Sequence, residues 1–299
     1  MRDASDVSTP QKVKRIGIIL ADMGKVNVSV LKFLILRMNT LQQTFEFEFL
    51  PTCKDEFLQK LSKQTKLSKQ TSVNRNEIKG AVPSFLDRYQ KYLQKEVAAY
   101  RIKDMELPTG HFILLSMACF NDNYYTTRKN GLAILALGNW EASMAPPSLI
   151  EFIYTLILRE SVAFISSSLS GSVHLGTKGC LCDFTASLSE VRLKVLNGFV
   201  CSYCRAALQS DGFALLPDEL VHILGKDWIG TSTDPRTPAG IAANLGYNLF
   251  ITKGLTTTRR ERIRTLLTEE VLKQFIANVG AIITGILIAY LLIRFGLKR

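Results

Sequence analysis

The stretch from position 174 to position 204 reads HLGTKGCLCDFTASLSEVRLKVLNGFVCSYC, and the prediction of the fold starts from it. Its metal-type ligands follow the spacing H-x5-C-x-C-x18-C-x2-C. A Cys-x2-Cys pair supplies two thiolates from one tight turn, and a second pair of ligands about twenty residues earlier completes the tetrahedral set of a structural zinc site. The sequence therefore predicts a structural zinc ion bound by His174, Cys180, Cys201 and Cys204.

Cys182 is the alternative ligand in this stretch, because its position allows it to replace Cys180 or His174. Gly179 directly precedes Cys180 and would ease the turn that such a metal site requires. Two other interpretations stay open. The thiols could be unbound in a reduced core, or the Cys-x2-Cys pair could be a redox pair, which leaves the upstream histidine and cysteine without a role.

The cellular context favours metal binding over disulfides. The first twenty residues lack the apolar run of a secretory signal, so the bulk of the chain is predicted to be cytosolic. In a reducing compartment, closely spaced cysteines bind metals more often than they pair. The two remaining cysteines, Cys53 and Cys119, are predicted to be ordinary thiols.

The cysteine pattern resembles that of the archaemetzincins, a branch of the zincin metallopeptidases. That family carries a helix of the form HExxHxxGxxHC followed by x4-CxM-x17-CxxC, in which the cysteines hold a second, structural zinc. Cys180-Leu181-Cys182 and Cys201-Ser202-Tyr203-Cys204 are similar to the second half of this pattern, and His174 stands where its opening cysteine would be. The chain departs from the family by its histidine at that position, by five residues rather than four after it, and by Cys182 in place of methionine.

The peptidase half of the resemblance is incomplete. Arg159-Glu160-Ser161-Val162-Ala163 occupies the place of HExxH, where Glu160 would match the general base, and Leu169 stands where the third histidine would fall. A catalytic zinc of this family needs three imidazoles, so none is implied here, and Glu160 is predicted to pair with a neighbouring arginine. Over residues 13–210 the resemblance implies a zincin-like α/β domain, a mixed sheet with helices and a zinc knuckle, that has lost the peptidase centre.

Hydrophobic periodicity independently predicts an α/β fold. The β-branched run VKRIGIILA at 13–21 and the alternating FEFEFL at 45–50 indicate strands, and apolar residues recur at helical spacing between them at 26–41. A polar helix is expected at 77–101, with further strands at 111–118 and 132–137. Ser148 is predicted to cap a strongly apolar helix, with Glu151 in its first turn.

The C-terminal region predicts one transmembrane helix at 275–296, because FIANVGAIITGILIAYLLI at 275–293 has no charge and matches the roughly 20 residues that a bilayer requires. A buried core helix is the alternative. The arginine-rich segment 256–274 is expected to be a juxtamembrane amphipathic helix. Small residues at intervals of four form a stripe on this helix, which consists of Ala277, Ala281, Gly285 and Ala289. The stripe predicts packing between copies of the membrane helix. The alternative is that small residues are simply common in membrane helices.

The predicted organisation is a flexible N-terminus at 1–12, an α/β zinc-binding domain at 13–228, and a connector at 229–255 before the two C-terminal helices. Within the domain, 57–75 is predicted to be a basic loop, with a frayed helix as the alternative. Hydrophobic residues make up 47% of the 299 positions and charged residues 21%, which excludes disorder for the bulk. The net charge of +11 suits an anionic partner. Nucleic acid is disfavoured, because the basic loop lacks interleaved aromatic residues.

These features favour a single-pass, tail-anchored membrane protein with the bulk of the chain in the cytoplasm. Its expected partners are the lipid bilayer, further copies of itself through the membrane helix, and an unidentified protein or small-molecule ligand of the α/β domain. The domain is expected to be catalytically inactive and to act as a sensor or interaction module, as in a membrane-acting defence or stress effector. The alternative is a membrane-bound divergent zinc peptidase that uses Glu160 and an unrecognised ligand set.

Overall fold

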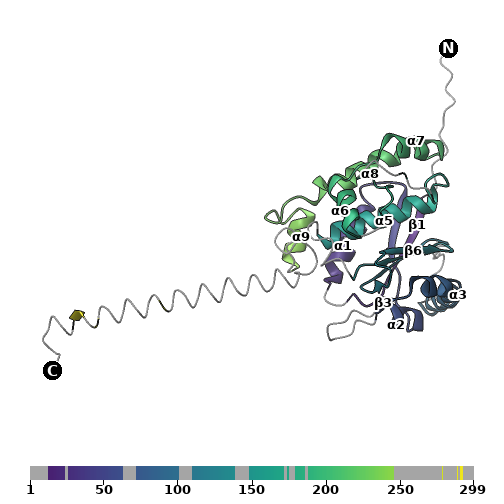
Figure 1. Cartoon of the computed structure of the whole chain (residues 1–299), viewed down its shortest axis with the longest axis horizontal. Helices are drawn as coiled ribbons and strands as arrows, with labels where there is room; N and C mark the ends of the chain where they lie inside the picture. The colour runs from purple at the N-terminus through teal and green to yellow at the C-terminus, as the bar shows by residue number, and fades with distance from the viewer. Residues whose placement is uncertain are drawn as a thin grey trace, which may run out of the picture. The chain divides into compact units, whose positions relative to one another are not determined.

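The computed structural model describes residues 13–23, 26–62, 72–100, 110–138, 148–171, 174, 179–185 and 188–245, together with Asn278, Ile288, Tyr290 and Leu291. The chain divides into two units, Met1–Thr256 and Thr257–Arg299. The first unit carries the sheet and all of the predicted zinc ligands (Figure 1).

A five-stranded mixed sheet in the order β2-β1-β4-β7-β6 forms the centre of this unit. Its strands are β1 (Lys14–Leu20), β2 (Phe45–Phe49), β4 (Phe112–Ser116), β6 (Thr126–Lys129) and β7 (Leu132–Ala136). The first four strands of that order are parallel, and only β6 runs antiparallel, at the edge beside β7. A separate two-stranded sheet pairs β3 (Ser72–Val73) with β5 (Cys119–Phe120). The predicted mixed α/β architecture is therefore confirmed.

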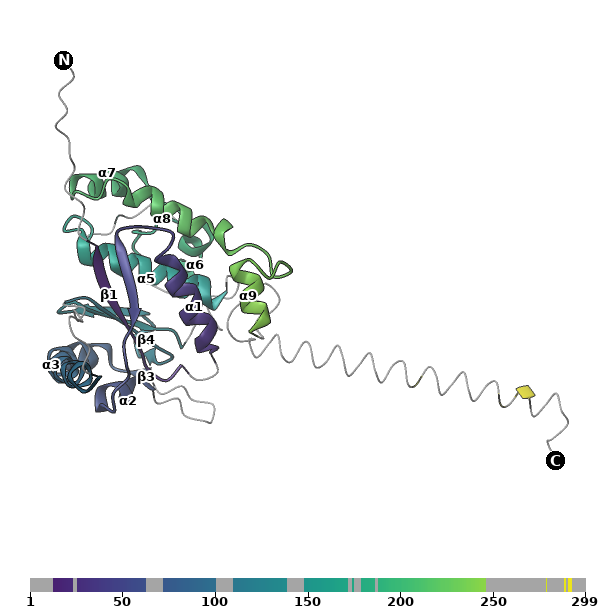
Figure 2. The ribbon, with the colours of Figure 1, turned by 180° about the vertical axis from the view of Figure 1, so that it is seen from behind.

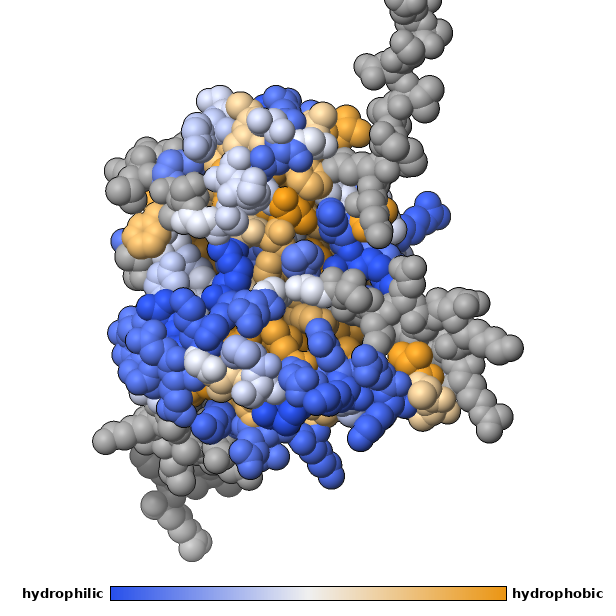
Figure 3. Space-filling view, turned by 90° about the vertical axis from the view of Figure 1, so that its right-hand side faces the viewer, coloured by the Kyte–Doolittle hydropathy of each residue, from blue (hydrophilic) through white to orange (hydrophobic). Residues whose placement is uncertain are grey.

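Helices cover both faces of the sheet, because the central strands are apolar on both sides, as parallel strands usually are. Ile16 and Ile18 of β1 face the core formed with α1 (Val28–Met38) and α5 (Leu149–Ile165). Ile19 of the same strand faces the opposite core, which is formed with α2 (Glu56–Ser62) and α3 (Arg75–Tyr100). Figure 2 shows the resulting three layers, and the outward face of α3 is hydrophilic (Figure 3).

Helix α5 is the central helix of the larger core, and its start follows the sequence prediction. The Ser148 side chain accepts a hydrogen bond from the Glu151 backbone N–H, and the Glu151 carboxylate accepts one from the Ser148 N–H, which completes a capping box. Leu149, Ile150 and residues 152–163 are buried, including the charged side chains of Arg159 and Glu160. This helix therefore brings two ionisable groups into the interior.

The remaining helices of the first unit pack beside α5 in the larger core. They are α6 (Leu188–Asn197), α7 (Ser202–Ser210), α8 (Leu216–Gly225), the 3-10 helix η1 (Asp227–Ile229) and α9 (Pro238–Asn244). Helix α9 lies within the segment 229–255, which the sequence predicted to be only a connector. Its Ala239 and Ala242 are fully buried, so this part of the segment belongs to the folded core.

Part of the predicted basic loop at 57–75 is helical as well. Helix α2 buries Phe57, Leu58 and Leu61, so the start of this segment is an ordered helix rather than a loop. Residues 63–71 lie outside the described part of the chain. The lysine-rich composition of 57–75 concealed this apolar face, although Lys60 is the one lysine within α2 itself.

The second unit holds the predicted juxtamembrane and membrane helices. Only four of its residues are described, at helical positions, and Ile288, Tyr290 and Leu291 among them are exposed. Within the residues that the structure covers, no helix has the length and apolar character needed to span a bilayer. The predicted helices at 256–274 and 275–296, with the stripe Ala277, Ala281, Gly285 and Ala289, lie outside the described residues apart from those four positions.

Candidate metal centre

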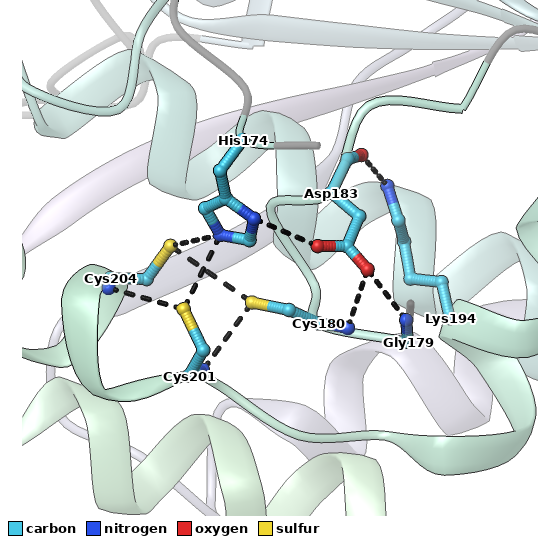
Figure 4. A network of polar contacts seen from close by, with 7 residues as sticks. All are labelled: His174, Gly179, Cys180, Asp183, Lys194, Cys201 and Cys204. Carbon is cyan, nitrogen blue, oxygen red and sulfur yellow. Dashed lines mark hydrogen bonds and ion pairs between the residues drawn. The ribbon is translucent and has the colours of Figure 1, made fainter. Parts of the chain in front are cut away.

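Four side chains from the stretch that the sequence singled out converge on one point. The ligand atoms of His174, Cys180, Cys201 and Cys204 all lie within 4.8 Å of one another. His174 Nε2 lies 3.0 Å from Cys204 Sγ and 3.3 Å from Cys201 Sγ, and the Sγ atoms of Cys180 and Cys204 are 3.9 Å apart (Figure 4). Cys180 and Cys204 are fully buried, while His174 and Cys201 are partly exposed.

Backbone structure places the two cysteine pairs against each other. Cys201 is the N-cap residue of α7, and its Sγ accepts a hydrogen bond from the Cys204 backbone N–H at 3.4 Å. Cys180 forms a parallel bridge with Phe199, just before that helix. Gly179 has a φ of +121°, and a Cβ atom there would lie 2.3 Å from Nδ2 of Asn197. The turn into Cys180 therefore requires glycine at position 179, in agreement with the expectation that Gly179 eases this turn.

The donor set fits a zinc ion. Zinc bonds of about 2.3 Å to sulfur and 2.0–2.1 Å to nitrogen place the ligand atoms of a tetrahedron about 3.5–3.8 Å apart. The separations of 3.0, 3.3 and 3.9 Å lie close to this range. One imidazole and three thiolates are also a usual set for structural zinc, whereas calcium and magnesium prefer oxygen ligands.

Asp183 holds the centre from outside the ligand set. Its Oδ1 lies 2.9 Å from Nδ1 of His174, which directs the Nε2 of that imidazole toward the sulfurs. Its Oδ2 accepts hydrogen bonds from the backbone N–H groups of Gly179 and Cys180, at 2.5 and 2.9 Å. A carboxylate behind a metal-binding histidine fixes the ring orientation and its tautomer. Asp183 therefore orients one ligand and the loop of another.

Two buried cations lie beside the sulfur cluster. Lys194 of α6 donates a hydrogen bond from Nζ to the backbone oxygen of Asp183 at 2.7 Å. Burial, and then the nearby Arg159, lower the pKa of Lys194 to about 8, whereas the neighbouring Cys182 and Asp183 act in the opposite direction. The Arg159 side chain comes from α5, and both residues act electrostatically on Cys182.

Cys182 is buried next to the four ligands. It does not belong to the group of four residues whose ligand atoms all lie within 4.8 Å of one another. Hydrogen bonds with the Cys180 and Cys204 thiols lower the pKa of Cys182, and hydrogen bonds with the Cys180 and Cys182 thiols raise the pKa of Cys204. A metal ion would remove the protons of Cys180 and Cys204, so these thiols could no longer donate to Cys182. Because Cys182 Sγ lies outside that group, the geometry favours the set with His174 and Cys180 over either set with Cys182.

Glu160, which the sequence resemblance would place as a general base, takes part in an ion pair. Glu160 Oε2 lies 3.2 Å from Nη1 of Arg128 on β6, and Oε1 accepts a hydrogen bond from the Thr126 hydroxyl at 3.4 Å. The predicted pairing of Glu160 with an arginine is confirmed. Among the described residues, the cluster at His174 is the one group of three or more histidine, cysteine or acidic side chains placed to hold a metal.

Sequence reasoning missed the groups around the ligands. Asp183, Lys194 and Arg159 come from a loop, from α6 and from α5, and only the tertiary packing brings them together. The adjacency of Asp183 to Cys182 was the one available signal, because a carboxylate near a ligand often supports a metal-binding histidine.

Comparisons with known proteins identify one similar solved structure. No family model matches the chain, and no curated protein matches it. The solved structure of archaemetzincin from Methanopyrus kandleri is similar to it, with a TM-score of 0.38 and 13% sequence identity over 67% of this chain and 95% of that chain. The metal centre rests on the geometry of its own ligands and not on this likeness.

Proposed function

We propose that this protein is a non-enzymatic sensor or interaction module, stabilised by one structural zinc ion and tethered to a membrane by its C-terminal segment. The observation that carries the proposal is the convergence of one histidine and three cysteines on a single point. A zinc ion bound by four protein side chains has no open position for water or substrate, which is the arrangement of structural sites.

The arrangement around Glu160 supports an inactive domain. A general base must reach the proton of an attacking water, and in zinc peptidases that water is bound to the metal. The Glu160 carboxylate is instead paired with Arg128 and hydrogen-bonded to Thr126. The group of candidate metal ligands consists of His174 and three cysteines, and Glu160 does not belong to it.

The membrane part of the proposal rests on the sequence alone. The uncharged segment 275–293 is long enough for one span, and the arginine-rich segment before it suits an anionic lipid surface. We place the zinc domain in the cytoplasm and the assembly of copies in the membrane helix, through Ala277, Ala281, Gly285 and Ala289. Recognition of a ligand by the domain would then alter clustering at the membrane, as expected of a defence or stress effector.

The metal content of the full-length protein, purified in detergent, tests the zinc domain. We expect one zinc per chain, retained during dialysis without chelator, because a closed four-ligand site exchanges slowly. A second, readily exchanged zinc would support a divergent peptidase, and absence of bound zinc would refute the structural centre.

Membrane fractionation tests the tether. We expect the full chain in the membrane fraction and a variant lacking 275–299 in the soluble fraction with its zinc retained. Gly285→Leu should remain membrane-bound but cross-link less, because a bulky side chain separates the helices without reducing their hydrophobicity. Unchanged cross-linking would reduce the segment to an anchor, and a soluble full-length chain would remove the membrane proposal.

A further inference from the structure

Arg159 and Lys194 are unusually deep for charged side chains. Their relative exposures are 8% and 3%. A buried charge is costly unless an opposite charge or several hydrogen bonds compensate it, and arginine and lysine are seldom buried without such a partner. Two such residues beside the same cluster therefore require an explanation.

Their hydrogen bonds do not supply the missing negative charge. Lys194 Nζ contacts the backbone oxygen of Asp183, and Arg159 Nη2 contacts the backbone oxygen of Leu169 at 3.4 Å. Arg159 Nη1 is buried without a hydrogen-bond partner. Across the described part of the chain, no carboxylate forms an ion pair with either residue, whereas Arg128 nearby is paired with Glu160.

The sulfur cluster does supply negative charge once a metal is bound. A divalent ion with three thiolates and one neutral imidazole carries a net charge of −1, and the carboxylate of Asp183 behind His174 adds a second negative charge. The two buried cations balance these charges. A centre with four thiolates would leave one negative charge without a counterpart.

We propose that Arg159 and Lys194 are the built-in counter-ions of the metal centre and fix its composition as one divalent ion, three thiolates and one imidazole. The inference rests on the proposed zinc site and adds two positioning residues to it. It also explains why the fold tolerates an unpaired guanidinium nitrogen on α5, since the charge of that group is matched across the cluster rather than by a single partner.

The first test measures zinc affinity of the full-length protein in detergent, by competition with a chromophoric chelator. Lys194→Met keeps the length of the side chain and removes its charge, so we expect about 10- to 100-fold weaker zinc binding. Lys194→Arg should bind within a few-fold of the wild type. Lys226→Met is the matched control, because Lys226 is a partly buried lysine of the same unit that pairs with Glu151 at 3.0 Å, and its zinc affinity should not change.

The second test separates charge balance from a packing role. Cys201→His converts the centre to two thiolates and two imidazoles and removes one negative charge. In the wild-type background it should weaken zinc binding, because it leaves one positive charge in excess. Combined with Lys194→Met it restores the balance, so the double variant should bind within about tenfold of either single variant instead of showing the product of their losses.

The outcomes are distinguishable. Multiplicative losses in the double variant, or an unchanged affinity in Lys194→Met, would overturn the counter-ion role while leaving the zinc site intact. A wild-type protein that does not bind zinc would overturn the proposed function itself. If Lys194→Met fails to fold, the same comparison with Arg159→Met decides the question, with Arg205→Met as its control, since Arg205 pairs with Asp218 on the surface.

Discussion

Replacement of Cys201 by serine removes one ligand and should abolish the zinc dependence of stability. A ligand that binds only the folded state stabilises it by about 4.1 kcal/mol when its free concentration is 1,000 times the dissociation constant. The zinc centre lies in the unit Met1–Thr256. For a domain of about 150–250 residues, each kcal/mol shifts the melting temperature by about 2–4 °C, so wild-type protein should gain about 8–16 °C with zinc.

Thermal melting with and without a zinc chelator measures this difference. Cys201→Ser should melt near the chelated wild type under both conditions and should contain almost no zinc. Cys53→Ser is the control, because Cys53 packs against the opposite face of the sheet with the α2 and α3 helices and should keep the full zinc-dependent shift. A zinc-dependent shift of the wild-type size in Cys201→Ser would remove Cys201 from the ligand set and refute the assignment.

Three further predictions concern single side chains. Cys182→Ser should keep its zinc and, after substitution with cobalt, the wild-type sulfur-to-metal charge-transfer band; loss of the metal would make Cys182 a ligand in place of Cys180 or His174. Glu160→Gln removes the ion pair with Arg128 and should lower stability in urea unfolding by only roughly 1–2 kcal/mol, because Arg128 is partly exposed to solvent. The variant should keep its zinc content and cellular activity. Loss of activity in a folded, zinc-loaded variant would support the peptidase instead. Burial, and then the nearby Lys14, lower the pKa of His111 below its usual 6.5, so below about pH 6.5 the unfolded chain binds more protons than the folded chain and stability falls as the pH drops. His111→Gln should therefore lose less stability than the wild type between about pH 7 and pH 5, and equal losses would show that this imidazole does not contribute.

The sequence predicted the inner strands and the central helix because each carries its own local signal. Four adjacent apolar side chains in β4, and the capping box of α5, can be recognised without knowledge of the fold. The edge strand β6 has no such signal, since TTRK at 126–129 is polar and only one side of the strand is paired. The turn that follows it does carry a local signal, since Asn-Gly is a usual pair of a two-residue hairpin turn, and Asn130 and Gly131 both have the positive φ that such a turn requires.

The ligands were predictable for a similar reason, and their surroundings were not. Cysteine and histidine spacing is a local pattern, so four candidate ligands could be chosen from 31 consecutive residues, His174 to Cys204. The charges of Arg159 and Lys194 are separated by 35 positions in the chain and meet only when α5 and α6 pack together. The sequence patterns of α5 and α6 are those of ordinary apolar or amphipathic helices and do not indicate that a charged side chain is buried. The burial of Arg159 and Lys194 could therefore be found only in the folded structure.

The position of the centre predicts which part of the domain depends on the metal. Its ligands lie in the segments around α6 and at the start of α7, whereas the strands β1, β4 and β7 are held by apolar packing on both faces. Chelation should therefore increase hydrogen exchange at residues 179–210, where the bridge between Cys180 and Phe199 and the cap of α7 would be released. The amides of β4 should remain protected, since Ile113, Leu114 and Leu115 are fully buried and the strand is hydrogen-bonded to β1 and β7 on its two sides. Equal loss of protection in β4 and at 179–210 would show that the metal stabilises the whole fold cooperatively, and protection unchanged in both would show that the four ligands hold their positions without it.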